Sequence, residues 1–66
     1  MKVRIDSEDD ALYFELDDAE IVESEEVQPG IILDFDNDGR LVGIEILDLS
    51  TRLAPEKLRL MQFETV

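Results

Sequence analysis

The acidic residues between positions 34 and 45 are those whose types and spacing suggest chemistry. Asp34, Asp36, Asp38, Gly39 and Glu45 match the calcium-loop pattern D-x-[DN]-x-[DN]-G-x5-E at every specified position. Carboxylate oxygens are preferred ligands of Ca²⁺ in proteins. Taken alone, the pattern makes Asp34, Asp36 and Asp38 candidate calcium ligands, with Glu45 as a bidentate ligand.

The residues around this pattern argue against a calcium loop. Such a loop lies between two helices, whereas the flanking residues here are rich in β-branched side chains, which is typical of strands. In an extended strand Glu45 lies about 23 Å beyond Asp38, too far to reach an ion held at the turn. We therefore predict no metal site and no cofactor. A weak calcium site in the 34–45 loop is the less favoured alternative.

The composition also argues against catalysis. The chain contains no histidine and no cysteine, so it lacks the commonest general base and the most reactive nucleophile. Its candidate hydroxyl groups have no obvious general base, and the last two suit a turn or helix cap: Ser7, Ser24, Ser50 and Thr51. A chain of 66 residues also has little room for a water-excluding pocket. We expect a protein that is not an enzyme and has no catalytic residues.

Residues 29–48 form the clearest structural unit, a predicted β-hairpin. Asp38-Gly39 suits the two central positions of a type I′ turn, which require positive φ. This turn pairs six apolar residues on one face: Phe35 with Val42, Leu33 with Ile44, and Ile31 with Ile46. The opposite face is mixed and pairs Asp36 with Leu41, Asp34 with Gly43, and Ile32 with Glu45. One apolar and one mixed face are typical of a one-sided antiparallel sheet.

Two further segments before this hairpin have the pattern of strands. Residues 1–6 and 11–16 alternate in polarity and form a second predicted hairpin, with five pairs: Ile5 with Leu12, Val3 with Phe14, Met1 with Leu16, Arg4 with Tyr13, and Lys2 with Glu15. Residues 20–27 carry several glutamates, which favours an edge strand or a solvent-facing strand. Pro29-Gly30 then fits the centre of a type II turn.

After Asp48 the sequence pattern predicts a change from strand to helix. Pro55 suits the first position of a short helix at about residues 54–59. Residues 59–66 fit either more helix or a terminal strand, and we favour the strand. The predicted fold class is therefore α+β, mostly β. It is an antiparallel β-meander of about five strands, with a short C-terminal helix and, in the favoured alternative, a terminal strand. One small domain spans residues 1–66.

The distribution of charge limits the kinds of partner. The formal net charge is −12, and the interval between Arg4 and Arg40 holds fourteen of the eighteen acidic residues and no Lys or Arg. Nucleic acid is an unfavourable partner for such a surface, whereas a basic protein suits it. A solvated acidic surface or a salt-adapted host would also explain the charge. No segment has the length of a membrane span, and charges occur too early for a signal peptide, so we expect a cytoplasmic, prokaryotic protein.

Several segments carry a family resemblance when taken together. They are DDALYF at 9–14, ESEEV at 23–27, PGIILDFD at 29–36 and DGRLVGIEILD at 38–48. In order and spacing, up to about Arg52, the chain resembles the small prokaryotic family called domain of unknown function number 2283. The resemblance implies a short β-rich domain without an assigned activity or catalytic residue. The resemblance also implies that members of the family are encoded near small toxin-like ribonucleases. Some family members would then be antitoxin-like.

Two classes of function fit these observations best. We expect a non-enzymatic protein-interaction module, of which an antitoxin would be one form, whose acidic surface binds a basic protein. The alternatives are a self-associating structural domain with no dedicated ligand and, third, the weak calcium binder. Because a core this small has no disulfide to support it, we also expect a homodimer. The C-terminal segment and residues 41–47 avoid most of the acids, so we expect them to form its interface.

Overall fold

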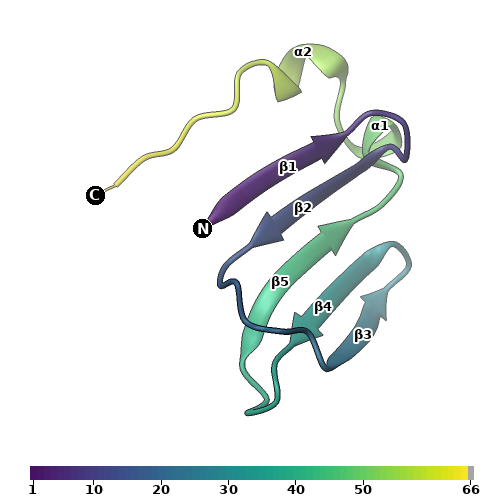
Figure 1. Ribbon diagram of the computed structural model, residues 1–66. Helices are drawn as coiled ribbons and strands as arrows, with labels where there is room; N and C mark the ends of the chain where they lie inside the picture. Colours follow the sequence, from purple (N-terminus) through teal and green to yellow (C-terminus); the bar gives the residue numbers. More distant parts are fainter. Residues whose placement is uncertain (66) are drawn as a thin grey trace.

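Five strands form one sheet, and two short helices follow them (Figure 1). The structure is a computed structural model that describes residues 1–65. The strands are β1 (Lys2–Asp6), β2 (Ala11–Glu15), β3 (Glu23–Gln28), β4 (Ile31–Phe35) and β5 (Leu41–Ile46). The helices are α1 (Leu49–Arg52) and α2 (Pro55–Leu58). The predicted class, mostly β with a short C-terminal helix, is confirmed.

The order of the strands in the sheet is β1-β2-β5-β4-β3, and every neighbouring pair is antiparallel. This order differs from a simple meander, in which β3 would lie between β2 and β4. Glu23 and Glu25 lie opposite Phe35 and Leu33, so a central β3 would enclose their carboxylates at a large desolvation cost. The observed order leaves all six residues of β3 exposed at an edge, as the acidic pattern predicted.

Both predicted hairpins form, with one irregularity. Four of the five pairs predicted between β1 and β2 are present, including Val3 with Phe14. The fifth, Met1 with Leu16, lies beyond the ends of both strands. Between β4 and β5 the predicted register holds from Ile31 to Asp34, which lies opposite Gly43. Phe35 then lies opposite Leu41 rather than Val42. Val42 is therefore the extra residue of a β-bulge, which corrects the predicted pair.

The turn between β4 and β5 explains this bulge. The predicted type I′ turn was wrong, because Gly39 has positive φ (76°) and Asp38 does not. The Gly39 amide instead donates to the Asp36 carbonyl at 3.1 Å, and the Asp36 amide donates to the Arg40 carbonyl at 3.0 Å. This pattern is a type I turn followed by a residue in the left-handed region. Asp36 Oδ1 stabilises the turn by accepting from the amides of Asp38 and Arg40, each at 2.9 Å.

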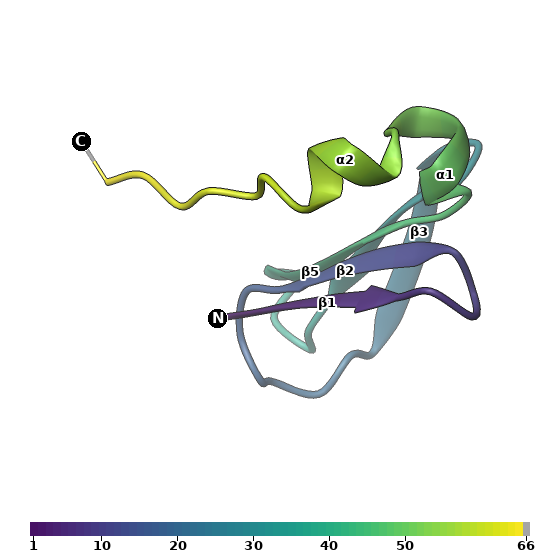
Figure 2. The same cartoon turned by 90° about the horizontal axis from the view of Figure 1, so that it is seen from above.

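The two faces of the sheet are covered differently. We call one the apolar face; its residues are Val3, Ile5, Leu12, Phe14, Ile31, Leu33, Ile44 and Ile46. The helices lie over this apolar face, and the link between β2 and β3 crosses the opposite face (Figure 2). The link contributes Ile21 to a groove on that opposite face, which we call the polar face. Only Leu12, Val42 and Leu49 are buried apolar residues in the described part of the chain.

The C-terminal part of the chain contains the predicted helix but no terminal strand up to Thr65. Helix α2 spans Pro55–Leu58 within the predicted 54–59. Residues 60–65, which we call the C-terminal arm, pass outside β1 without pairing to a strand (Figure 1). The predicted terminal strand was therefore wrong for these residues, because the arm leaves the sheet, and Val66 lies outside the described residues. Neither described helix has the length and apolar character needed to cross a membrane.

Replacing Leu49 tests whether helix α1 completes the small core. Leu49 is 3 % exposed, and its amide donates to the Asp10 carbonyl at 2.9 Å. Leu49→Ala should lower the free energy of unfolding by about 2–5 kcal/mol, because it leaves a cavity in the core. Leu53→Ala is the matched control, since Leu53 follows the same helix but is exposed. Urea unfolding followed by circular dichroism measures both, and equal losses would contradict the assigned core.

Candidate functional site

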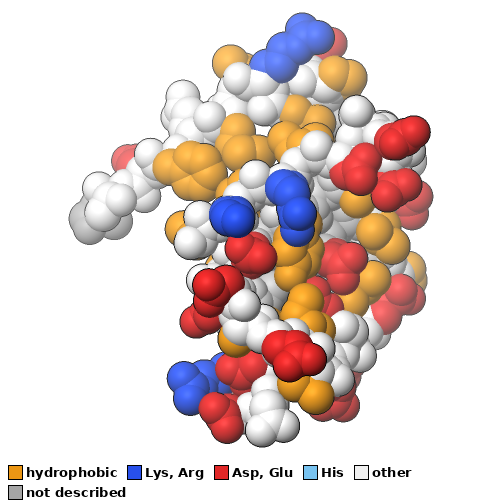
Figure 3. Space-filling view, viewed as in Figure 1, with side chains coloured by type: hydrophobic (Ala, Val, Ile, Leu, Met, Phe, Trp, Pro, Cys, Tyr) orange, Lys and Arg blue, Asp and Glu red, His pale blue; other side chains and the backbone are white. Residues whose placement is uncertain are grey.

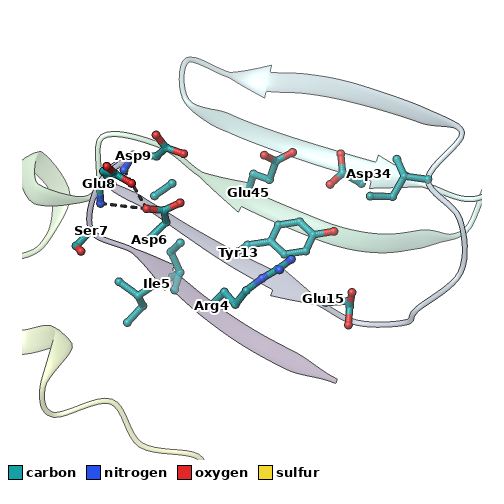
Figure 4. Close-up of a pocket in the computed structure, with 13 residues that line it drawn as sticks. Arg4, Ile5, Asp6, Ser7, Glu8, Asp9, Tyr13, Glu15, Asp34 and Glu45 are labelled. Atoms are coloured by element: carbon teal, nitrogen blue, oxygen red, sulfur yellow. Dashed lines mark hydrogen bonds between the residues drawn. The ribbon is translucent and has the colours of Figure 1, made fainter.

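Three polar side chains from adjacent strands meet at the centre of the polar face. Tyr13 on β2 lies opposite Glu45 on β5, and Asp34 on β4 lies opposite Gly43 on β5. Alternation along each strand directs Tyr13, Asp34 and Glu45 to the same side. Figure 4 shows them projecting together, with the hydroxyl end of Tyr13 directed towards Asp34. We call these three residues the polar cluster.

Asp34 is the buried member of the polar cluster. Its exposed fraction is 2 %, and within residues 1–65 it is the one buried polar side chain. Ser24 on β3, directly opposite Asp34, donates its hydroxyl to Asp34 Oδ1 at 2.6 Å. A buried carboxylate needs such donors because it has lost its hydration. The Ser24 bond therefore both satisfies Asp34 and attaches the edge strand to the sheet.

Gly43 provides the space that Tyr13 occupies. A Cβ atom added to Gly43 would lie 2.9 Å from Tyr13 Cζ and 3.1 Å from Tyr13 Cε1. These distances are shorter than van der Waals contact, so the Tyr13 ring rests directly on the backbone of β5. Only glycine permits so close an approach of a ring to a strand. The pair Tyr13–Gly43 thus joins β2 to β5 at the polar cluster.

The environment of the polar cluster changes the acidity of two groups. Burial raises the pKa of the Glu45 carboxyl, and the Asp34 carboxylate raises it further through its charge and as a hydrogen-bond partner. Burial also raises the pKa of the Tyr13 hydroxyl, with further contributions from the charges of Asp34, Glu15 and Glu45. Both shifts favour the protonated forms, because burial disfavours a charged group and the cluster already carries negative charge.

Arg4 provides a positive charge beside the polar cluster. Its guanidinium carbon lies 5.5 Å from the centre of the Tyr13 ring, a cation–π contact. Arg4, Tyr13, Asp34 and Glu45 line an open groove that continues to the acidic turn after β1. Asp34 is only 2 % exposed, so it presents little of its carboxylate to the groove. The groove offers carboxylate and phenol oxygens, so its chemistry suits hydrogen bonding to a cationic group.

The structure separates the candidate calcium ligands. Asp34 lies in the polar cluster, whereas Asp36 accepts two backbone amides in the turn. Asp38 Oδ2 forms an ion pair with Arg40 Nη2 at 3.1 Å. Among residues 1–65 no group of three or more acidic side chains is placed to hold a metal ion. Glu45, which the calcium pattern makes the bidentate ligand, instead lies opposite Tyr13 of β2.

Three of the four candidate hydroxyl groups have structural partners. Ser24 donates to Asp34, as described above. Ser50 Oγ donates to Asp10 Oδ2 at 2.7 Å, and the Ser50 amide donates to Asp10 Oδ1 at 2.9 Å. Thr51 Oγ1 donates to the Asp48 carbonyl at 2.7 Å. These bonds place Ser50 and Thr51 in the first turn of α1, where they tie the helix to the turn before β2. Ser7 lines the groove.

The sequence pattern singled out Asp34 only as a less favoured calcium candidate and did not identify its partners in the polar cluster. The predicted hairpin register already placed Asp34 beside Gly43 on the mixed face. What it lacked was the pairing of β2 with β5, which brings Tyr13 over Gly43. The available signal was a glycine within a β-branched strand, since such a glycine marks close approach of another group.

The raised pKa of Glu45 predicts how stability depends on pH. A carboxyl whose pKa is higher in the folded protein than in the unfolded chain contributes stability below its ordinary value, 4.5. That contribution is lost as the pH rises through the raised value. Glu45→Gln should therefore have a higher melting temperature than wild type at pH 7, and this difference should shrink towards pH 4. Thermal unfolding across this range measures it.

Glu56→Gln is the control for this experiment, because it makes the same change in net charge at an exposed residue of α2. It should alter the melting temperature little and should keep the wild-type dependence on pH. A lower melting temperature for Glu45→Gln at pH 7, or the same profile for both variants, would show that Glu45 is not destabilised by its surroundings.

Comparison with known proteins identifies a family for most of the chain. The model of the family described as protein of unknown function (DUF2283) matches residues 2–50, which include all five strands and the start of α1. No curated protein and no solved structure matches the chain. The predicted resemblance is confirmed, and the matched part covers well over half of the sequence. The chain belongs to the DUF2283 family.

Proposed function

We propose that this protein is a non-enzymatic interaction module that binds a basic protein through the edge strand β3. One observation carries the proposal: all six residues of β3 are exposed at the edge of the sheet, and three of them are glutamates. An edge strand presents unpaired backbone N–H and C=O groups that another strand can bind. Strand β3 therefore combines a backbone template with negative charge.

The charges of β3 are not neutralised by the protein itself. In the described residues the one ion pair joins Asp38 and Arg40 in the turn between β4 and β5. The link before β3 adds exposed Asp17, Asp18 and Glu20. Figure 3 shows acidic side chains at the lower right of the polar face, where Figure 1 places β3, and more of them at the upper right, near the turn between β1 and β2. A basic partner would gain attraction along this whole edge.

The same charges make β3 unsuitable for binding a second copy of itself. Antiparallel pairing of two β3 strands would bring Glu23, Glu25 and Glu26 of both copies together, and like charges on paired strands are destabilising. A strand carrying Lys or Arg would replace this repulsion by attraction. Edge charge thus favours a partner of opposite charge over self-pairing.

The proposed partner class includes, but is not limited to, the toxin of a toxin–antitoxin pair. A toxin that acts on RNA needs a basic surface, and an acidic edge could cover that surface. An interaction role also agrees with the absence of histidine and cysteine from the sequence and with the burial of Asp34. None of these features requires a cofactor.

A tagged pull-down from the native host, at low and moderate salt, can test this proposal. The captured protein is purified, and its affinity for three baits is measured by calorimetry. The baits are wild type, Glu23→Gln/Glu25→Gln/Glu26→Gln, and the control Glu8→Gln/Glu56→Gln/Glu64→Gln. Both triple variants change the net charge equally, and all six residues are exposed. We expect a basic partner whose binding weakens about tenfold or more in the β3 variant alone. Equal weakening in both variants would contradict the role of β3.

Self-association is the second candidate function, and it is favoured by exposed apolar side chains. The exposed apolar residues include Met1, Ile5, Leu60 and Phe63, whereas only three apolar residues are buried in the described chain. Residues 41–47 cannot contribute to self-association by strand pairing, because β5 has a neighbouring strand on each side. Their expected interface would have to use a face of the sheet, where Leu41 is 37 % exposed. Self-association by either route does not depend on a basic partner.

A further inference from the structure

Strand β1 forms the edge opposite β3, and its character is different. Four of its five residues are exposed, and it carries Lys2 and Arg4 but only one acid, Asp6. In a chain with a net charge of −12 this strand is locally positive. Its outer backbone groups have no neighbouring strand. The edge at β1 is therefore the place where two copies can approach with the least repulsion.

The sequence of β1 is complementary to itself in antiparallel pairing. A two-fold axis perpendicular to the sheet pairs residues of the same face, and centring it on Arg4 uses the whole strand. Lys2 of each copy then lies opposite Asp6 of the other, and Val3 lies opposite Ile5. Centring the axis on Val3 would instead place Lys2 opposite Arg4, and centring it on Ile5 would leave Lys2 outside the ladder.

The two Arg4 side chains at this axis need not repel strongly. Each guanidinium lies over the Tyr13 ring of its own copy, 5.5 Å from the ring centre. Tyr13 belongs to β2, so this contact draws the charge of Arg4 away from the outer edge of β1. The charge pairs between Lys2 and Asp6 remain at the two ends of the strand.

The C-terminal arm provides a second, independent observation at the same edge. Figure 1 shows the arm passing outside β1, and Figure 2 shows it on the side of the sheet that carries the helices. Its apolar residues have little cover within one copy, since Leu60 is 67 % and Phe63 71 % exposed. On the apolar face, Phe14, Leu33 and Ile44 are only half-buried. An arm that extends past β1 would lie over this face of a neighbouring copy.

We propose that two copies join through their β1 edges as a two-fold dimer and exchange their C-terminal arms. The two five-stranded sheets would become one continuous sheet of ten strands. The arm of each copy would cover the apolar face of the other with Leu60, Met61 and Phe63. This interface leaves both β3 edges at the outer ends of the dimer, free for the proposed basic partner. The dimer goes beyond the proposed function, because it uses a different edge and does not require that partner.

Cysteine cross-linking tests the register directly, because the natural chain contains no cysteine. In the proposed dimer the two Arg4 Cα atoms lie about 4.5–5.5 Å apart, within the range that a disulfide spans. Under mild oxidation Arg4→Cys should form a covalent dimer at least about tenfold faster than Glu25→Cys, which places an exposed thiol on the opposite edge. Cross-linking of both variants at one rate would overturn the β1 interface.

Sedimentation equilibrium tests the exchange of arms. Wild type should have twice the 7.6 kDa chain mass at high micromolar concentration, and the dimer should strengthen with salt because two acidic chains repel. Phe63→Ala/Leu60→Ala should weaken the dimer about tenfold or more, whereas Val27→Ala, which shortens an exposed residue of β3, should not. A wild-type monomer at low and high salt would overturn the dimer. Equal affinity of wild type and the arm variant would overturn the exchange.

Discussion

The pairing of β2 with β5 is the interaction on which the rest of the structure depends. It joins two local units, the hairpin of β1 and β2 and the three strands β3, β4 and β5. On the apolar face the seam is made by Leu12 against Ile46 and Phe14 against Ile44. On the polar face the ring of Tyr13 rests on Gly43. Without this seam neither unit could bury its apolar side chains.

The seam also places the acids where their charge is tolerated. With β2 and β5 at the centre, β3 becomes an edge, and its glutamates remain in solvent. Asp34, the one buried carboxylate among residues 1–65, receives a hydrogen bond from Ser24 of that edge strand. The two edges of the sheet therefore differ in charge, and this difference is the basis for the two partners proposed above, a basic protein at β3 and a second copy at β1.

The local elements were predictable because their signals lie within short segments. Alternation gave the β1–β2 register, and the acids of residues 20–27 indicated an edge strand. Pro55 marked the start of α2. The β4–β5 turn was mispredicted because the side chain of Asp36, rather than the Asp38-Gly39 pair, determines its type. The resulting bulge at Val42 follows from that longer turn.

The arrangement of these elements could not be predicted from local patterns. No residue of the link between β2 and β3 indicates that it crosses the sheet, so the predicted meander placed β3 rather than β5 beside β2. The polar cluster depends on that long-range pairing, because Tyr13 meets Asp34 and Glu45 only when β2 lies beside β5. Spacing alone made Asp34 a calcium candidate. Its observed neighbours, Ser24 and Tyr13, lie on other strands and come from distant parts of the chain.

A double-mutant cycle between Tyr13 and Gly43 tests the seam most directly. Gly43→Ala should cost about 1–3 kcal/mol of stability in wild type, because its Cβ would meet the Tyr13 ring. In a Tyr13→Thr background the ring is absent, so Gly43→Ala should be neutral or stabilise the strand by about 0.5–1 kcal/mol. Urea unfolding of the four proteins gives the coupling. An equal cost of Gly43→Ala in both backgrounds would contradict the contact that joins β2 to β5.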